Sequence, residues 1–149
     1  MRRLIFLDST PLGILSHPKP EQSSAITNWV IALETAGCRI VVPAIIYYEV
    51  RREFLRAGLT RSLRRLEAFA HAEPGRYLSL TDGALDHAAT LWADARRRGR
   101  PTGDPKGLDI DVILASQALS LGTGAIVATS NVKHLQQFCD ATHWTEIQP

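Results

Sequence analysis

Short apolar runs alternate along the chain with longer segments in which apolar residues recur every three or four positions. The runs are rich in leucine, isoleucine and valine and lie at residues 3–8, 38–44, 76–80 and 125–130. Runs of this length, bounded by turn residues, are typical of strands buried on both faces. The sequence therefore predicts four buried strands, and the segment 144–148 is a candidate for a fifth.

The intervening segments have the periodicity of amphipathic helices. The first runs from Pro20 to Gly37, and a glycine commonly follows the last turn of a helix. In the segment 81–99, Trp92 falls on the apolar face and is expected in the core. The segment 109–122 is expected to begin with an acidic first turn. The predicted helices span 20–37, 43–58, 61–70, 81–99, 109–122 and 131–138.

Alternating strands and helices indicate an α/β fold. Such a chain forms a three-layer α/β/α structure with a mostly parallel central sheet, here of about four to five strands. The length of 149 residues and the 45% hydrophobic content suit a single domain over residues 1–149, without repeats or linkers.

Several carboxylates are expected at one edge of this sheet. Ligands of parallel sheets bind outside the carboxyl ends of the strands. Asp8 ends the first run, Glu49 follows the second, and Asp109 and Asp111 open a later helix. Carboxylates gathered at one edge repel one another unless a cation neutralises them. Because oxygen ligands suit hard divalent ions, the pattern points to Mg²⁺ or Mn²⁺.

Each of these acids also has an ordinary structural explanation. Asp8 could cap a turn or a helix, and Asp109 and Asp111 could complement the dipole of a helix start. Glu49 could be screened by Arg52 on the same helix. These explanations stay open at the level of the sequence.

Composition and cysteine spacing argue against certain kinds of site and cellular location, but they do not select a function. The formal net charge of +2 is too small to establish a polyanionic partner. Cys38 and Cys139 form no C-x-x-C pair, which argues against a disulfide framework or a thiolate zinc site. No stretch approaches the ~20 apolar residues of a membrane span. We expect a cytoplasmic protein that does not enter a membrane.

Four stretches together resemble the PIN-domain nucleases, especially the VapC-like toxins of bacterial toxin–antitoxin pairs. They are "FLDSTPL", "IIYYEVRREF", "DVILASQALSLG" and "IVATSNVKHLQQF", in the order of that family. The resemblance implies that Asp8, Glu49 and Asp111 are metal ligands. It also implies that Thr129 and Asn131 belong to a polar turn beside them, with Thr10 as a further orienting residue.

The resemblance further implies an activity and partners. The expected activity is a Mg²⁺-dependent or Mn²⁺-dependent endoribonuclease that hydrolyses RNA phosphodiester bonds as the toxin of a type II pair. The expected partners are the RNA substrate, a cognate antitoxin and a second copy of the chain.

The sequence departs from the family pattern at two places. His134 occupies a position where many relatives have an acid, and imidazole is a poor ligand for Mg²⁺. The segment before Asp111 is longer than usual and adds Asp104 and Asp109. Asp109 could replace the missing acid and is taken as a fourth candidate ligand, or the site could bind metal more weakly.

Arginines gather in two segments. Ten of the 17 lysines and arginines lie within residues 51–65 and 96–100. Such clusters can attract phosphates, although a solvated helix face is an equal explanation. The candidate RNA contacts are Arg51, Arg52, Arg64 and Arg65.

Two other functions compete with the nuclease. In a non-catalytic PIN-like module, His134 would mark a decayed metal site, and the protein would only bind RNA or a protein. A phosphatase of the haloacid-dehalogenase type would need a second acid at the position of Thr10.

Overall fold

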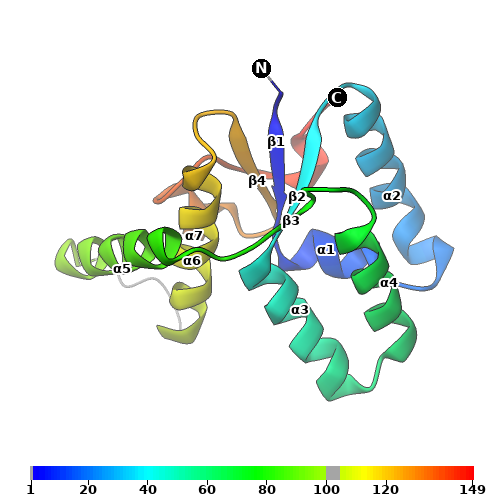
Figure 1. Cartoon of the computed structure of the whole chain (residues 1–149), viewed down its shortest axis with the longest axis horizontal. Coiled ribbons are helices and arrows are strands. Elements are labelled where there is room, and N and C mark those ends of the chain that lie inside the picture. The colour runs from blue at the N-terminus through cyan, green and yellow to red at the C-terminus, as the bar shows by residue number, and fades with distance from the viewer. Residues whose placement is uncertain (1, 100–104) are drawn as a thin grey trace.

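The central feature of the structure, a computed structural model that describes residues 2–99 and 105–149, is one parallel sheet (Figure 1). All four strand pairs are parallel, which confirms the predicted α/β fold. Within the described residues the order of strands across the sheet is β3-β2-β1-β4-β5. The strands are β1 (Leu4–Leu7), β2 (Arg39–Pro43), β3 (Tyr77–Leu78), β4 (Ala125–Thr129) and β5 (Ala141–His143).

Helices cover both faces of this sheet and give the predicted three layers. In Figure 1, α1 to α4 lie on one side of the strands and α5 to α7 on the other. The helices are α1 (Ser9–Leu15), α2 (Pro20–Thr35), α3 (Ala44–Ala57), α4 (Thr60–His71), α5 (Asp82–Arg97), α6 (Pro105–Ser120) and α7 (Val132–Gln136).

The sheet has a topological switch point between β1 and β4. The chain builds the sheet outward from β1 through β2 to β3, then returns to place β4 on the other side of β1. Helices after β1 and β4 therefore diverge, and a parallel sheet binds ligands at such a switch point. Leu7 pairs with Ala128, and the amide of Asp8 donates to the carbonyl of Ala128 at 3.0 Å. Asp8 stands at the switch point.

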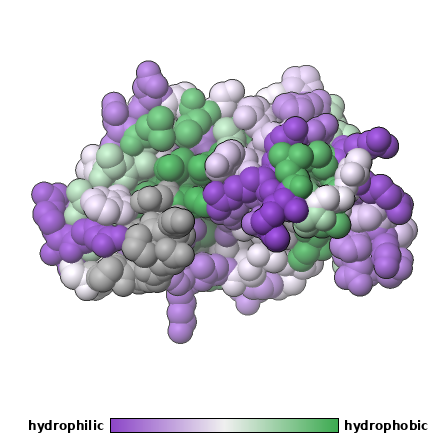
Figure 2. Space-filling model, turned by 90° about the horizontal axis from the view of Figure 1, so that it is seen from below, coloured by the Kyte–Doolittle hydropathy of each residue, from purple (hydrophilic) through white to green (hydrophobic). Residues whose placement is uncertain are grey.

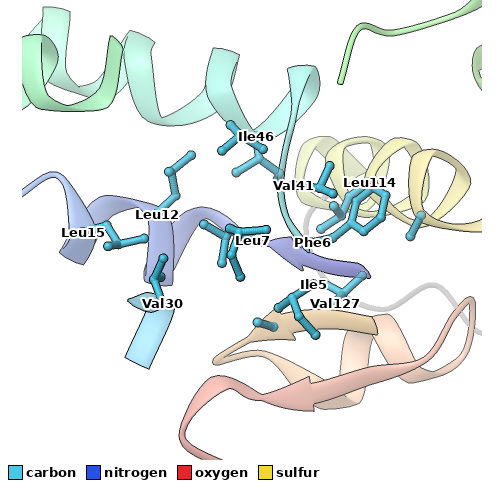
Figure 3. Packing of buried hydrophobic residues seen from close by; sticks show 14 of the residues in the cluster. Ile5, Phe6, Leu7, Leu12, Leu15, Val30, Val41, Ile46, Leu114 and Val127 are labelled. Atoms are coloured by element: carbon cyan, nitrogen blue, oxygen red, sulfur yellow. The ribbon is translucent and has the colours of Figure 1, made fainter. Parts of the chain in front are cut away.

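The core forms around β1, the middle strand. Ile5, Phe6 and Leu7 are fully buried because helices cover both faces of the strand, which explains the continuous apolar run. Alternate side chains point to opposite layers, and Figure 3 shows Phe6 beside Leu114 of α6, with Leu7 toward Leu12 of α1. This packing fixes the end of β1 relative to α1 and α6.

Two helices differ from the predictions. The helix α1 was not predicted, because its seven residues are too few to establish a periodic pattern. The helix α6 begins at Pro105 rather than at 109, so Asp109 and Asp111 do not lie in its first turn. Proline is well suited to the first turn because it has no amide hydrogen to leave unpaired.

The predicted terminal strand at 144–148 is wrong. The strand β5 precedes it at Ala141–His143, where Ala141 pairs with Val127, and Trp144–Glu146 form a 3₁₀ helix. The helix α5 also departs from expectation, since Trp92 is 38% exposed. The small residues Ala88 and Ala95 are buried instead, Ala88 against α6, and Leu85 stays exposed like Trp92.

Within the described residues, no helix is both long enough and apolar enough to cross a membrane.

A buried glutamine joins three elements near the carboxyl ends of the strands. The Gln117 amide on α6 donates to the carbonyl of Leu78 at 3.1 Å, and its oxygen accepts the amide of Ile45 at 3.4 Å. Gln117 is 1% exposed, so these groups have little access to water. The contact holds the start of α3, which carries Glu49, against the helix that carries Asp111.

We predict that Gln117→Leu lowers the free energy of unfolding by about 1–3 kcal/mol, because it leaves buried polar groups without partners. Urea denaturation measures the loss. Gln22→Leu, the same change at an exposed position on α2, should stay within about 0.5 kcal/mol of the parent protein. Equal stability of Gln117→Leu and the parent would contradict the role of this contact.

Candidate active site

Asp8 is held rigidly at the end of β1. Its Oδ1 accepts the amide of Ser9 at 2.7 Å, which caps α1, and its Oδ2 accepts the hydroxyl of Thr129 at 2.7 Å. The residue is 8% exposed. Burial raises the pKa of Asp8, while the hydrogen bonds from Thr129 and Ser9 oppose that rise. Asp8 is thus a helix cap, as one reading of the sequence proposed, and also an acid at the switch point.

Thr129 and Asn131 support Asp8 through a chain of hydrogen bonds. The amide of Asn131 donates to Thr129 Oγ1 at 2.8 Å, and this hydroxyl then donates to Asp8. Because Thr129 is fully buried and its oxygen accepts from the backbone, its hydrogen is directed at the carboxylate. Asn131 acts here through its main chain. Thr10 is exposed, and its hydroxyl accepts from Ser130 at 3.0 Å.

Asp111 and Glu49 approach Asp8 from two other elements. Asp111 lies on α6 and Glu49 on α3, and both are half-buried. The pKa of Asp111 is raised to about 7, first by burial and then by the negative charges of Asp8 and Glu49. The sequence prediction that these acids gather at one edge of the sheet therefore agrees with the electrostatics of the structure.

Asp109 and Asp104 cannot be placed in this site. The backbone of Asp109 lies in α6, but its side chain is outside the described part, and Asp104 lies wholly outside it. Their roles stay predictions. His134, at the position of the expected acid, lies half-buried on α7, and its carbonyl accepts the side-chain amide of Gln137 at 3.1 Å.

Cys139 lies near these acids, which sequence reasoning did not anticipate. Burial raises the pKa of its thiol to about 12, and the charges of Asp140, Asp111 and Asp8 add to the rise. The thiol is therefore protonated at neutral pH, and it donates weakly to the carbonyl of Leu135 at 3.7 Å. A lone cysteine outside any metal-binding spacing gave no signal in the sequence.

The donor atoms at this edge suit a hard divalent cation. Asp8, Glu49 and Asp111 supply only carboxylate oxygens, and their mutual repulsion is the condition that a cation relieves. Apart from residues 1 and 100–109, whose side chains are not described, no three histidine, cysteine or acidic side chains converge closely enough to hold a metal. The chemistry of the donors fits, and the acids would have to draw closer to form a complete cage.

The end of the molecule at which the strands finish carries both hydrophilic and hydrophobic surface. Figure 2 looks onto the end of the molecule where the strands end, and a strongly hydrophilic band crosses its middle between two hydrophobic patches. Of the three acids, Glu49 and Asp111 are half-buried and Asp8 is nearly buried, so the first two offer part of their surface to a molecule that approaches this end.

The four candidate arginines differ in their surroundings. Arg51 forms an ion pair with Glu67, and Arg65 donates to the carbonyl of Leu15 at 3.4 Å. Arg64 is exposed on α4, and Arg52 lies over the ring of Tyr48. Arg52 and Arg64 are therefore better placed than the other two to contact a phosphate.

We predict that Asp111→Asn raises the melting temperature of the protein in EDTA at pH 8 by about 3 °C or more. The raised pKa makes the folded state hold a proton that the unfolded chain releases between about pH 4 and 7, so stability falls as pH rises through this range. Asparagine carries no charge, so the variant does not lose stability in this way. Its gain in melting temperature over the parent should therefore shrink toward pH 4. Asp86→Asn, an exposed control on α5, should show no such trend. A pH-independent effect of Asp111→Asn would contradict the raised pKa of Asp111.

Comparison with known proteins gives matches among solved structures alone. No protein-family model matches the sequence, and no curated protein matches it either. VapBC-1 from nontypeable Haemophilus influenzae is 23% identical, with a TM-score of 0.65 over 96% of this chain and 99% of that one.

Two further structures match over similar lengths. VapBC2 from Rickettsia felis, bound to a DNA fragment from its promoter, is 14% identical, with a TM-score of 0.73 over 95% of this chain and 98% of that one. FitAcB from Neisseria gonorrhoeae is 17% identical, with a TM-score of 0.68 over 96% and 99%.

These matches cover nearly the whole chain, and at such low identity they establish its fold. That fold has the mostly parallel central sheet that the sequence predicted. The chain has the PIN-domain fold of the VapC-type toxins in VapBC and FitAB toxin–antitoxin complexes.

Proposed function

We propose that this protein is the toxin of a type II toxin–antitoxin pair and acts as a Mg²⁺-dependent endoribonuclease. The observation that carries the proposal is the electrostatic influence of Asp8 and Glu49 on Asp111 beside the switch point of the parallel sheet. Burial, and then the negative charges of Asp8 and Glu49, raise the pKa of Asp111, so holding its carboxylate in this place is costly to the fold. A function that uses the three charges together accounts for that cost better than three separate structural roles.

The proposed chemistry is hydrolysis of a phosphodiester bond. A Mg²⁺ or Mn²⁺ ion held by Asp8, Glu49 and Asp111 would lower the pKa of a bound water and offset charge on the phosphate under attack. Thr129 and Ser9 each donate to one oxygen of Asp8, which fixes the plane of the carboxylate and leaves a further lone pair on each oxygen. Asp111 would give up its proton as it becomes a ligand.

The proposed partners follow from the solved structures that share the fold. The matching structures are VapBC and FitAB complexes, which supports an antitoxin as a partner of this chain. An antitoxin that covers the acidic edge of the sheet would keep the enzyme inactive, and a second copy of the chain is the other expected partner. RNA, rather than DNA, is the substrate that we propose.

One specific observation favours a second candidate, a non-catalytic PIN-like module. His134 occupies the position of an expected acid, and the described acids do not by themselves form a complete cage. Such a module would bind RNA or a protein without cleaving it. The phosphatase alternative has no support, because Thr10, at the position of the required second acid, is engaged by Ser130.

Cleavage of a pool of structured and single-stranded RNA by the purified protein tests the proposed activity. We expect cleavage with Mg²⁺ or Mn²⁺ and none with EDTA. Asp8→Asn and Asp111→Asn should each lower the rate about 100-fold or more, because each removes charge that the reacting centre requires. Glu146→Gln, which changes an exposed acid on the 3₁₀ helix, serves as the matched control. Cleavage that persists in EDTA or in Asp111→Asn would refute the assignment.

We predict that Arg64→Ala weakens RNA binding and lowers the slope of log affinity against log salt by about 0.7, the value for one phosphate contact on a single strand. Filter binding in EDTA over a range of salt concentrations measures both quantities. Arg2→Ala, an exposed arginine before the opposite end of β1, should change neither. If the two variants behave alike, the arginines of α4 are an ordinary solvated helix face.

A further inference from the structure

The helix α5 carries an apolar stripe that no other described part of the chain covers. Leu85 and Trp92 are 43% and 38% exposed, although both side chains are large and apolar. Ala89 lies between them and is also exposed, and the spacings of four and three residues place all three on one face of the helix. Single exposed apolar residues are common, whereas a contiguous patch of them indicates an interaction site.

An apolar cavity of about 330 Å³ lies along this stripe. Its lining comes from α5 and α6 and consists of Leu85, Ala88, Ala89, Trp92, Val112 and Ile113. Apart from the indole N–H of Trp92, these side chains offer no hydrogen-bonding group. The cavity therefore suits apolar side chains of another protein surface better than a polar ligand.

The helix α5 also stands apart from the main core. Figure 1 shows it extending away from the sheet, and its main packing partner among the described elements is α6. Ala88 and Val112 form a small buried cluster that is separate from the core around β1. Because so little apolar surface of α5 is buried, covering the stripe would add to the stability of the helix.

Opposite charges stand at the two ends of the stripe. Asp82 precedes Leu85 by three residues and Arg96 follows Trp92 by four, so both lie on the face of the stripe. The guanidinium carbon of Arg96 is 4.8 Å from the centre of the Trp92 ring. Among the described side chains, neither Asp82 nor Arg96 forms an ion pair. A surface that matches the stripe needs a cation at the Asp82 end and an anion at the Arg96 end.

The stripe meets this requirement itself when it is turned end to end. Asp82 and Arg96 are each seven residues from Ala89, while Leu85 is four residues before it and Trp92 three after it. In two antiparallel copies of α5 that cross at Ala89, Leu85 faces the partner's Trp92 and Asp82 faces the partner's Arg96. The small alanine side chain lets the two helices approach closely at the crossing. Two-fold symmetry then forms each contact twice.

We propose that α5 is the interface between two copies of this chain, paired antiparallel about a two-fold axis at Ala89. The pairing covers the cavity of each copy and neutralises the charges at both ends of the stripe. Val112 and Ile113 line the cavity and directly follow Asp111 on α6, so the interface adjoins the helix that carries one of the three acids. The inference gives the second copy of the chain a defined surface, and it does not depend on the proposed catalysis.

The test is the mass of the purified protein in solution, measured by analytical ultracentrifugation over a range of concentrations without RNA or metal. We expect the parent to be a dimer that dissociates on dilution. Ala89→Glu should weaken the dimer about tenfold or more, because two like charges meet at the crossing. His87→Glu adds the same charge to another exposed face of α5 and should leave the dimer unchanged, which makes it the matched control.

A reciprocal exchange of charges tests the antiparallel arrangement. Asp82→Lys and Arg96→Glu should each weaken the dimer, because each places like charges opposite one another at both ends. The double variant restores opposite charges and should recover the dimer, although both changes oppose the helix dipole. The two positions lie about 21 Å apart along one helix, so recovery requires contact between copies.

Three results would overturn the inference. A parent that is monomeric at every concentration would leave the stripe to a different protein. An unchanged dimer in Ala89→Glu, or an equal loss in His87→Glu, would show that the interface lies elsewhere. A double charge variant that stays monomeric would refute the antiparallel pairing.

RNA cleavage by the parent separates this inference from the proposed function. A monomeric parent that cleaves RNA with Mg²⁺ would refute the interface alone. A parent that dimerises through α5 and cleaves nothing with any metal would refute the nuclease alone. A monomeric parent without cleavage would refute both.

Discussion

A buried carboxylate at the end of the central strand is the constraint on which the rest of the structure depends. Asp8 continues β1 without a gap, and its two oxygens accept from the amide that starts α1 and from the hydroxyl that ends β4. The same group therefore begins a helix, links two strands and carries charge into the site. Core packing around Ile5, Phe6 and Leu7 fixes where that charge stands.

Glu49 and Asp111, which lie near Asp8, add further negative charge at the end of β1. Asp111 is held near Asp8 and Glu49 by the packing of α6 and α3, which Gln117 joins. The pKa of Asp111 is raised first by burial and then by the charges of Asp8 and Glu49, so the fold holds this carboxylate at a cost to its own stability. Active sites commonly contain such arrangements, because the interaction that destabilises the fold is the one that a bound cation makes favourable.

The sequence predicted the parts of the molecule that depend on local pattern. Three of the four apolar runs became largely buried strands, whereas the third gave only the two-residue, half-buried edge strand β3. Asp8, Glu49 and Asp111 became candidates because each stood after a predicted strand or near a predicted helix start. Short elements were missed or misplaced, as α1 and β5 show, because tertiary contacts rather than periodicity define them. The nearness of Cys139 and the linking role of Gln117 depend on contacts between distant segments, which no single stretch encodes.

The most direct test of the account is calorimetric titration of the purified protein with Mn²⁺ at neutral pH. The account predicts saturable binding to the parent protein and to the control Glu146→Gln, with loss of binding in Asp8→Asn and in Asp111→Asn. Binding that needs both acids would establish that the repelling carboxylates form a single cation site. A parent protein that takes up no Mn²⁺, or variants that bind it as tightly as the parent, would contradict the central claim.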